Sequence, residues 1–395
     1  MKIEKMDHLG RGIGFDNGKV VFVSKTMPGD EINIQEVKEH KKYNEVLKYE
    51  FLNKASNHCE EFCPYYQKCG GCHIQNMSYE DGLKYKKERV QNILSKVGIV
   101  NDIEVIENKY DKNYRNKIEL KIIDGKIGFY ENKSHKIIEI EKCMITKKCV
   151  NDFIFVLKNM EIKNGDITLR CNYNDELLIW IKTDDPVIID ESVLPIYKVV
   201  GIIKNDKRLY GEEHFLDKIE NMFFEVSYNS FFQVNSYINE RLFELIKENV
   251  EGDTVLDLYS GVGTLSLMAS RKAKKVYAIE VIPNAVINAI KNARINNVKN
   301  AEFILGNVED KIKFIEDKID TIIVDPPRSG LDRETINKIL ELKPEKLIYI
   351  SCETQKLTED LKYLLNDYEV TKLYILDMFS YTYHIETMVV LQKRG

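Results

Sequence analysis

The 395-residue sequence contains no apolar run long enough to cross a bilayer, and its first residues, MKIEKMDHLGRG, lack the apolar segment of a secretory signal. It also has no internal repeat and no low-complexity tract. Hydrophobic residues make up 44% and charged residues 31%, which is typical of a globular chain. We therefore expect a cytoplasmic monomer without membrane contact, and the length favours two or three domains.

A large excess of one charge is also missing, since the formal net charge is -5. The first 150 residues carry 27 Lys and Arg against 23 Asp and Glu, and the remainder is acidic. Nucleic-acid binding requires a local basic face rather than a basic whole. Charge by itself therefore neither indicates nor excludes such a partner.

Four of the eight cysteines fall between positions 59 and 72. In a reducing compartment, clustered cysteines indicate metal ligands rather than disulfides. Cys63, Cys69 and Cys72 together with the distant Cys143 offer four thiolates, and soft ligands of this kind select zinc or an iron–sulfur cluster. Cys59 is spare. Cys59 and Cys63 begin like a radical S-adenosylmethionine motif, but position 66, where its third cysteine is required, is Tyr66. We expect a structural role for the cluster.

Residues 1–57 are predicted to form a small β-barrel of the TRAM or oligonucleotide-binding type. Short β-rich runs there alternate with turn signals such as Asp16-Asn17-Gly18. Residues 58–215 mix helical and β-rich stretches, including a hairpin signal at Asp124-Gly125. The helix expected over 79–97 is basic, and such a run usually faces solvent: Lys84, Lys86, Lys87 and Arg89.

From about residue 238, strand and helix patterns alternate to the end of the chain, which predicts a parallel sheet covered on both faces. The last two strands are separated only by a loop over 377–386, so they should pair antiparallel. The fold class is α/β, and a seven-stranded, mostly parallel sheet of this kind over 216–395 resembles the Rossmann-like S-adenosylmethionine methyltransferase fold.

A glycine-rich turn follows the first of these strands. Gly261 and Gly263 come after the strand residue Asp257, and glycines at the carboxyl end of a strand let backbone approach a ligand closely. The third glycine of the dinucleotide fingerprint is replaced by Ser266, which counts against a nicotinamide cofactor. The next strand ends in Glu280, which can accept hydrogen bonds from ribose hydroxyls. This combination resembles the S-adenosylmethionine signature.

Two more strand ends carry reactive groups. One continues as Asp325-Pro326-Pro327-Arg328 and the other as Ser351-Cys352. Uracil C5 becomes nucleophilic only when a thiolate adds to C6, and a base must later remove the C5 proton. Cys352 can supply the thiolate and Glu386, at the start of the last strand, can supply the base. The residues alone leave open that Cys352 is a small buried hydrophobe and that Glu386 faces solvent.

These motifs, with Ser230-Phe231-Phe232-Gln233-Val234-Asn235 before them and His384-Ile385-Glu386 after them, resemble the RNA uracil-5-methyltransferase family, which acts on 23S rRNA and, in one branch, on tRNA. The resemblance implies that Cys352 is the nucleophile and Glu386 the proton acceptor. One departure is visible, because Glu353-Thr354 replaces the usual Asn-Pro. The resemblance further implies that six residues line the cofactor and base pocket: Gln233, Tyr259, Thr264, Glu280, Asn307 and Asp325.

The same resemblance implies a [4Fe–4S] cluster on Cys63, Cys69, Cys72 and Cys143, and it favours 23S rRNA over tRNA as the RNA partner. It divides the chain into the barrel (1–57), an iron–sulfur and RNA-binding domain (58–215) and a catalytic domain (216–395). Three alternatives remain: a tRNA uracil-5-methyltransferase, an RNA cytosine-C5 methyltransferase and a non-catalytic iron–sulfur RNA-binding protein. The cytosine enzymes place a second cysteine in the Pro-Pro loop, and this loop has none.

Overall fold

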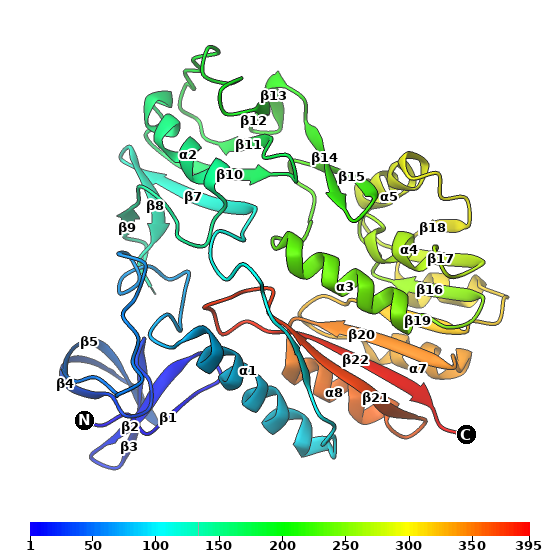
Figure 1. Ribbon diagram of the computed structural model, residues 1–395, viewed down its shortest axis with the longest axis horizontal. Coiled ribbons are helices and arrows are strands. Elements are labelled where there is room, and N and C mark those ends of the chain that lie inside the picture. Colours follow the sequence, from blue (N-terminus) through cyan, green and yellow to red (C-terminus); the bar gives the residue numbers. More distant parts are fainter. Residues whose placement is uncertain (133) are drawn as a thin grey trace.

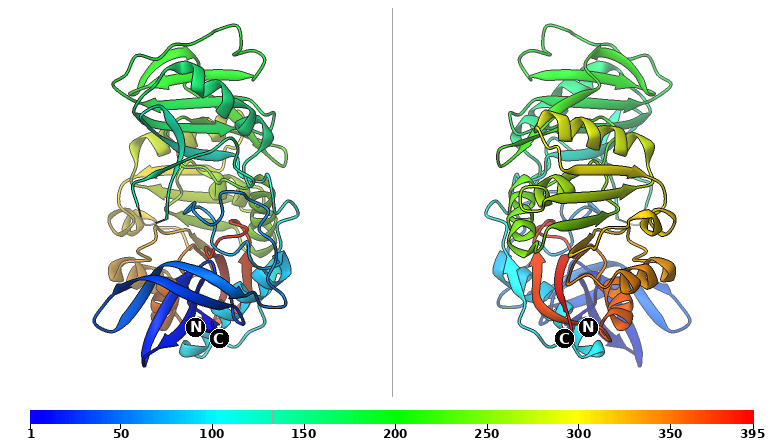
Figure 2. Two further views of the ribbon diagram at one scale, coloured as in Figure 1. Left: turned by 90° about the vertical axis from the view of Figure 1, so that its left-hand side faces the viewer. Right: turned by 90° about the vertical axis from the view of Figure 1, so that its right-hand side faces the viewer.

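A computed structural model provides the structure of the chain and describes residues 1–132 and 134–395. The strands of these residues form four sheets, of five, seven, two and eight strands (Figure 1). The seven-stranded sheet lies at one end of the molecule and the five-stranded sheet at the opposite end (Figure 2). Among the described helices, none combines the length and the apolar character that crossing a membrane requires.

The five-stranded sheet is formed by the N-terminal residues in the order β1-β2-β3-β5-β4. A bridge between Lys2 and Glu31 joins its two edges, and Val21, Val23 and Ile32 are among the buried residues of its core. The β-rich runs of the sequence therefore pair into one sheet with connected edges. The strands are β1 (Lys5–Met6), β2 (Arg11–Asp16), β3 (Lys19–Ser24), β4 (Glu31–Glu39) and β5 (Tyr43–Asn53).

The seven-stranded sheet has the order β13-β12-β11-β10-β7-β8-β9, and α2 (Lys148–Leu157), followed by a short 3-10 turn (Lys158–Met160), packs on it through Phe153 and Leu157. Asp124 and Gly125 form the predicted two-residue hairpin between β7 and β8, with φ of 51° and 76°. The strands are β7 (Lys117–Ile123), β8 (Lys126–Tyr130), β9 (Ile137–Glu139), β10 (Gly165–Cys171), β11 (Leu177–Lys182), β12 (Val199–Lys204) and β13 (Lys207–Gly211).

The sheet of the C-terminal half has eight strands, so the prediction of seven was wrong by one. The added strand, β6, comes from residues 104–106 and pairs in parallel with β21, with Tyr374 opposite Glu104. Three residues far from the alternating pattern carry no periodicity that would reveal them. The order is β18-β17-β16-β19-β20-β22-β21-β6. The strands are β6 (Glu104–Ile106), β16 (Thr254–Leu258), β17 (Lys275–Glu280), β18 (Ala301–Leu305), β19 (Thr321–Val324), β20 (Lys346–Ser351), β21 (Tyr368–Leu376) and β22 (Glu386–Lys393).

The predicted antiparallel end of this sheet is confirmed, since β22 pairs antiparallel with both β20 and β21. The remaining strands from β18 to β20 are parallel neighbours. In such an arrangement the carboxyl ends of the parallel strands meet at one edge. Because β22 runs the opposite way, its first residue also lies at that edge.

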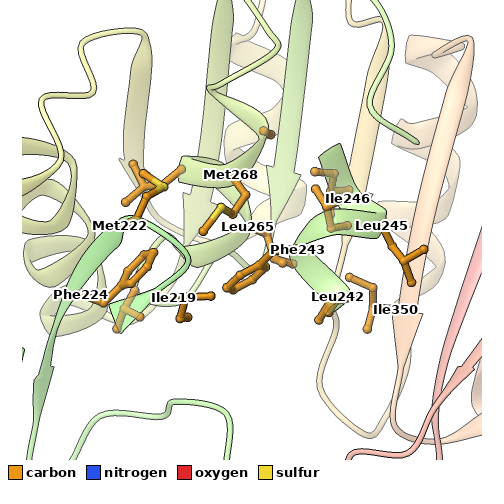
Figure 3. Packing of buried hydrophobic residues seen from close by; sticks show 14 of the residues in the cluster. Ile219, Met222, Phe224, Leu242, Phe243, Leu245, Ile246, Leu265, Met268 and Ile350 are labelled. Carbon is orange, nitrogen blue, oxygen red and sulfur yellow. The ribbon is translucent and has the colours of Figure 1, made fainter. Parts of the chain in front are cut away.

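Helices cover both faces of the eight-stranded sheet. On one face, Phe243 and Met268 pack with Ile350 and with Met222 and Phe224 of the two-stranded sheet (Figure 3). That small sheet consists of β14 (His214–Ile219) and β15 (Met222–Ser227). The helices are α1 (Tyr79–Leu94), continued by a 3-10 turn (Ser95–Val97), α3 (Ser236–Asn249), α4 (Thr264–Ala269), α5 (Pro283–Ile295), α6 (Val308–Lys311) with a 3-10 turn (Ile312–Phe314), α7 (Arg333–Leu342) and α8 (Thr354–Leu364).

Helix α1 belongs structurally to the opposite face of this sheet, although it lies far from it in the sequence. Its Val90 and Leu94 are fully buried in the core that also contains residues of α7 and α8. Lys86, expected on a solvated face, is 1% exposed, so that expectation was wrong for this residue. Its ammonium donates to Asp377 Oδ1 at 2.6 Å and to the Phe379 carbonyl at 3.0 Å. A buried lysine is tolerated because it is paired.

We predict that Lys86→Met lowers the free energy of unfolding by about 3–5 kcal/mol, because it leaves the Asp377 carboxylate buried without its counter-charge. Urea unfolding followed by circular dichroism measures this loss. Lys87→Met is the matched control, since Lys87 lies one residue further on, is paired with the exposed Asp102, and should leave the midpoint close to wild type. An equal loss of unfolding free energy in Lys86→Met and Lys87→Met would contradict the stabilising role of the buried Lys86–Asp377 pair.

Candidate active site

One cavity of about 530 Å³ opens at the edge where the parallel strands end and β22 begins. It brings together residues from well-separated parts of the chain, between Asn229 and Glu386. Of the ten residues predicted to act in catalysis or cofactor binding, eight line it: Gln233, Tyr259, Gly261, Thr264, Glu280, Asp325, Cys352 and Glu386.

The turn after β16 forms one wall of this cavity. Tyr259 has a φ of 64° and Gly261 a φ of 55°, and a Cβ built on Gly261 would meet no atom within 4 Å. The Glu280 carboxylate at the end of β17 accepts the backbone N–H groups of Gly261 at 2.9 Å and Ile282 at 2.8 Å. Glu280 therefore holds the turn in place, and the open side of Gly261 leaves room for a ligand.

Gly263 and Asn307 do not line this cavity. A Cβ on Gly263 would lie 2.9 Å from the Phe303 ring, and its φ is 82°, so this glycine serves close packing below the turn. Asn307 lines an adjoining cavity of about 380 Å³, which shares Tyr259 and Glu280 with the first. Asn307 thus lies next to the predicted cofactor site rather than inside the same hollow.

Three carboxyl groups at or near the site have raised pKa values: Asp325 and Glu386, which line the cavity, and Asp257, which is buried in β16. Burial raises the pKa of Asp257 to about 7, although the Ser266 hydroxyl donates to it, and burial likewise raises the pKa of Asp325 to about 7. The pKa of Glu386 lies well above its ordinary value because of burial and the neighbouring Asp325, and Arg328 opposes this rise. A carboxyl group in such surroundings is suited to accept and release a proton near neutral pH.

Cys352 and Glu386 meet because of the register between β20 and β22. Ser351 pairs with Thr387 in this antiparallel ladder, so the residue after Ser351 lies opposite the residue before Thr387. Glu386 is 5% exposed, and the solvent-facing position that the sequence left open does not occur. Cys352 is partly exposed toward the cavity rather than sealed in the core.

The electrostatics of Cys352 depend on a residue that the sequence did not single out. Burial, followed by the charges of Glu386 and Asp325, raises the pKa of the Cys352 thiol to about 11. Arg328 counteracts this through its charge and through a hydrogen bond to the sulfur. Arg328 was visible in the Asp325-Pro326-Pro327-Arg328 motif, but only the fold brings its side chain to the thiol.

We predict that Arg328→Met raises the pKa of Cys352 and moves the rising limb of the pH–rate profile to higher pH. The thiolate is the reactive form, so at a pH below both pKa values a pKa higher by one lowers the thiolate fraction, and with it the rate, about tenfold. Alkylation of Cys352 by iodoacetamide, followed by mass spectrometry across pH, measures the thiol directly. Arg333→Met, which changes an arginine stacked on Tyr363 outside the cavity, should leave the profile unchanged. An unaltered pH–rate profile in Arg328→Met would show that Arg328 does not lower the pKa of the Cys352 thiol.

Helix α8 begins directly after Cys352, although Glu353-Thr354 replaces the Asn-Pro that is usual in the family. Glu353 is the N-cap of α8, and its side chain accepts the Gln355 N–H at 3.5 Å. Thr354 is the first helical residue. Asparagine and proline are favoured at these two positions for the same capping reasons. The replacement therefore preserves the local geometry that presents Cys352.

A second cavity of about 420 Å³ brings together Cys63, Cys69, Cys72 and Cys143. Cys59 does not line it, in keeping with its being spare. The loop is held from the N-terminal sheet, because the buried Lys25 ammonium donates to the carbonyls of Tyr66 and, at 2.8 Å, of Cys69. This cavity shares four lining residues with the first: Phe231, Phe232, Gln233 and Phe379.

The spacing of the four sulfurs bears on which centre they could hold. Around tetrahedral zinc, with bonds of about 2.3 Å, sulfurs lie roughly 3.8 Å apart. In the part of the chain that the structure describes, Cys149, Cys171 and Asp175 form the only group of three or more such ligand atoms within 4.8 Å of one another. No three of the four cluster thiols therefore lie within 4.8 Å of one another, which is wider than the spacing around a mononuclear zinc ion.

Comparisons with known proteins agree with this site. The family described as tRNA (Uracil-5-)-methyltransferase matches residues 206–394. An uncharacterized RNA methyltransferase of Clostridium acetobutylicum is 33% identical over 443 aligned residues, covering 99% of this chain and 96% of the relative. Another, of Caldanaerobacter subterraneus subsp. tengcongensis, is also 33% identical, with 100% and 98% covered. The chain belongs to the RNA uracil-5-methyltransferase family.

A solved structure extends the agreement to the whole fold. The tRNA (uracil-54, C5)-methyltransferase of Pyrococcus abyssi, in complex with S-adenosyl-L-homocysteine, is 27% identical and superposes with a TM-score of 0.84. The match covers 99% of each chain. Members of this family use S-adenosylmethionine, and the α/β methyltransferase fold expected from the sequence is confirmed.

Proposed function

We propose that this protein methylates C5 of a uridine in RNA, with Cys352 as nucleophile and Glu386 as the base that removes the C5 proton. The observation that carries the proposal is the β20–β22 register, which places a thiol and a buried carboxyl group opposite each other in the cavity that also contains the glycine turn.

The chemistry follows from these two groups. The Cys352 thiolate forms a bond to uracil C6, and the electrons of the C5–C6 double bond move toward C5 and O4, so that C5 becomes an enolate-like nucleophile. After C5 has gained its methyl group, Glu386 takes the C5 proton. The released electron pair restores the C5–C6 double bond and expels the Cys352 thiolate. Arg328 stabilises the thiolate before addition and after its release.

S-adenosylmethionine, when bound, supplies the electrophilic methyl group. The residues of the turn fit such a ligand, because the Ser260 hydroxyl is buried at the cavity wall without a hydrogen-bond partner in the described residues and Gly261 is open above it. We assign cofactor binding to Tyr259, Gly261, Thr264 and Glu280, with Gly263 shaping the turn. Gln233, Asn307 and Asp325 complete the walls toward the base and the adjoining cavity.

We further propose that Cys63, Cys69, Cys72 and Cys143 hold a [4Fe–4S] cluster. Support comes from four thiols lining one cavity with a spacing wider than zinc requires. The cluster would stabilise the domain over 58–215, between a TRAM-like barrel (1–57) and the catalytic domain (216–395). Basic side chains at the cluster cavity offer a path for the RNA backbone: Arg115, Lys117 and Lys142.

We propose 23S rRNA as the substrate, on the resemblance of the cysteine pattern to the rRNA-modifying branch. The tRNA alternative is favoured by the Pyrococcus abyssi enzyme, whose stated substrate is uracil-54 of tRNA. Cytosine-C5 chemistry is disfavoured because Cys352 is the one cysteine at the catalytic cavity in the described residues.

The decisive experiment compares transcripts of 23S rRNA fragments and tRNAs incubated with the purified protein and S-adenosylmethionine, followed by nucleoside mass spectrometry. We expect 5-methyluridine in an rRNA fragment and not in tRNA. Methylation of tRNA alone would replace the substrate while retaining the chemistry, whereas 5-methylcytidine or no methylation of either RNA would refute the proposed reaction. Mapping of methyl groups on rRNA from a strain lacking the protein locates the uridine.

A further inference from the structure

A second group of potential metal ligands lies at one end of the seven-stranded sheet, apart from the four-cysteine cavity. Cys149 is in the first turn of α2, Cys171 is the last residue of β10, and Asp175 lies in the turn between β10 and β11. One ligand atom of each lies within 4.8 Å of the other two. The Cys149 thiol donates to Asp175 Oδ1 at 3.5 Å.

We propose that Cys149, Cys171 and Asp175 bind one zinc ion, as a structural site separate from the iron–sulfur ligands. Two sulfurs and one carboxylate form a donor set that suits zinc, whereas calcium and magnesium require oxygen ligands. Asp175 is largely exposed, so water completes the fourth position from the solvent side.

The charges around the group suit a divalent cation. Two thiolates and a carboxylate carry three negative charges, and a zinc ion leaves one of them uncompensated. Lys147 supplies the balancing charge, since its ammonium lies 3.8 Å from Asp175 Oδ1. Lys147 is also the N-cap of α2 and makes no side-chain capping bond, so the positive end of the helix, whose first turn contains Cys149, carries no capping side chain.

The site would fix a strand end that supports the catalytic cavity. The Cys171 N–H donates to the Asn116 carbonyl at 2.9 Å, and the Asn116 amide donates to the Gln233 carbonyl at 3.2 Å. Arg170, the residue before Cys171, donates to the Ser230 carbonyl at 2.9 Å. An ion at the end of β10 would therefore restrain Arg170 and Asn116, which hydrogen-bond to the segment containing Ser230 and Gln233.

Zinc binding to the full-length protein tests the proposal. Wild type, Cys149→Ser, Asp175→Asn and the control Cys59→Ser are equilibrated with zinc chloride, dialysed and analysed by mass spectrometry of the metal. We expect Cys149→Ser to contain one zinc per chain less than wild type and Cys59→Ser to match wild type. Loss of a residue that only hydrogen-bonds a metal ligand typically weakens metal binding 10- to 100-fold. Asp175→Asn changes a proposed ligand itself, so we expect it to weaken zinc binding by on the order of 100-fold.

A measurement on the unaltered chain guards against variants that fail to fold. Zinc chloride should slow iodoacetamide labelling of Cys149 at least about tenfold, with no change at the control Cys59, because a metal-bound thiolate reacts slowly. Equal zinc content in wild type and Cys149→Ser would overturn the proposal. Unprotected Cys149, or a disulfide between Cys149 and Cys171 in zinc-loaded protein, would overturn it as well.

Discussion

Cys352→Ala is expected to lower methyl transfer by more than about ten-thousandfold, since removing a covalent nucleophile leaves only binding and positioning to accelerate the reaction. S-adenosylmethionine binding should persist, because the residues assigned to cofactor binding lie at the ends of other strands. Incorporation of labelled methyl groups into RNA measures the rate, and calorimetry measures the cofactor affinity.

The matched control is Cys59→Ala, which removes a partly exposed thiol outside both large cavities. This variant should methylate RNA at the wild-type rate. If Cys352→Ala kept an activity within tenfold of wild type, a group other than Cys352 would activate uracil C5 for methyl transfer. Loss of cofactor binding together with activity would instead indicate that Cys352 supports the fold of the site.

Glu386→Gln should stop the reaction after methyl transfer and trap the RNA on the enzyme. An amide cannot remove the C5 proton, so the bond between Cys352 and C6 cannot break by elimination. We expect a slowly migrating species on denaturing gels that depends on S-adenosylmethionine and disappears with ribonuclease. Turnover should fall by more than about a thousandfold.

Glu359→Gln, on the exposed side of α8, is the control and should turn over normally without an adduct. RNA containing 5-fluorouridine offers a second measurement, because the wild-type enzyme cannot remove fluorine from C5 and should form the same adduct. Normal turnover by Glu386→Gln, or the absence of an adduct on the fluorinated RNA, would contradict the roles given to these residues.

The buried pair Lys86–Asp377 connects these chemical predictions to the fold. Asp377 begins the loop that runs to Glu386, and its carboxylate also accepts the hydroxyls of Tyr79 and Ser380 at 2.8 and 2.6 Å. The loop that leads to the proposed base is therefore held by a helix from the first hundred residues of the chain. Lys86→Met should lower activity as well as stability, although Lys86 does not line the catalytic cavity.

The sequence by itself determined the alternation of strands and helices, the glycine turn, the antiparallel final pair and the residue types available for chemistry. These are local properties, because turn residues and hydrophobic periodicity act over a few neighbouring positions. The tertiary structure decided which distant residues meet: β6 with β21, Lys86 with Asp377, Arg328 with Cys352, and Cys149 with Cys171. Such contacts depend on strand register and helix packing across the whole chain, which no short window of sequence contains.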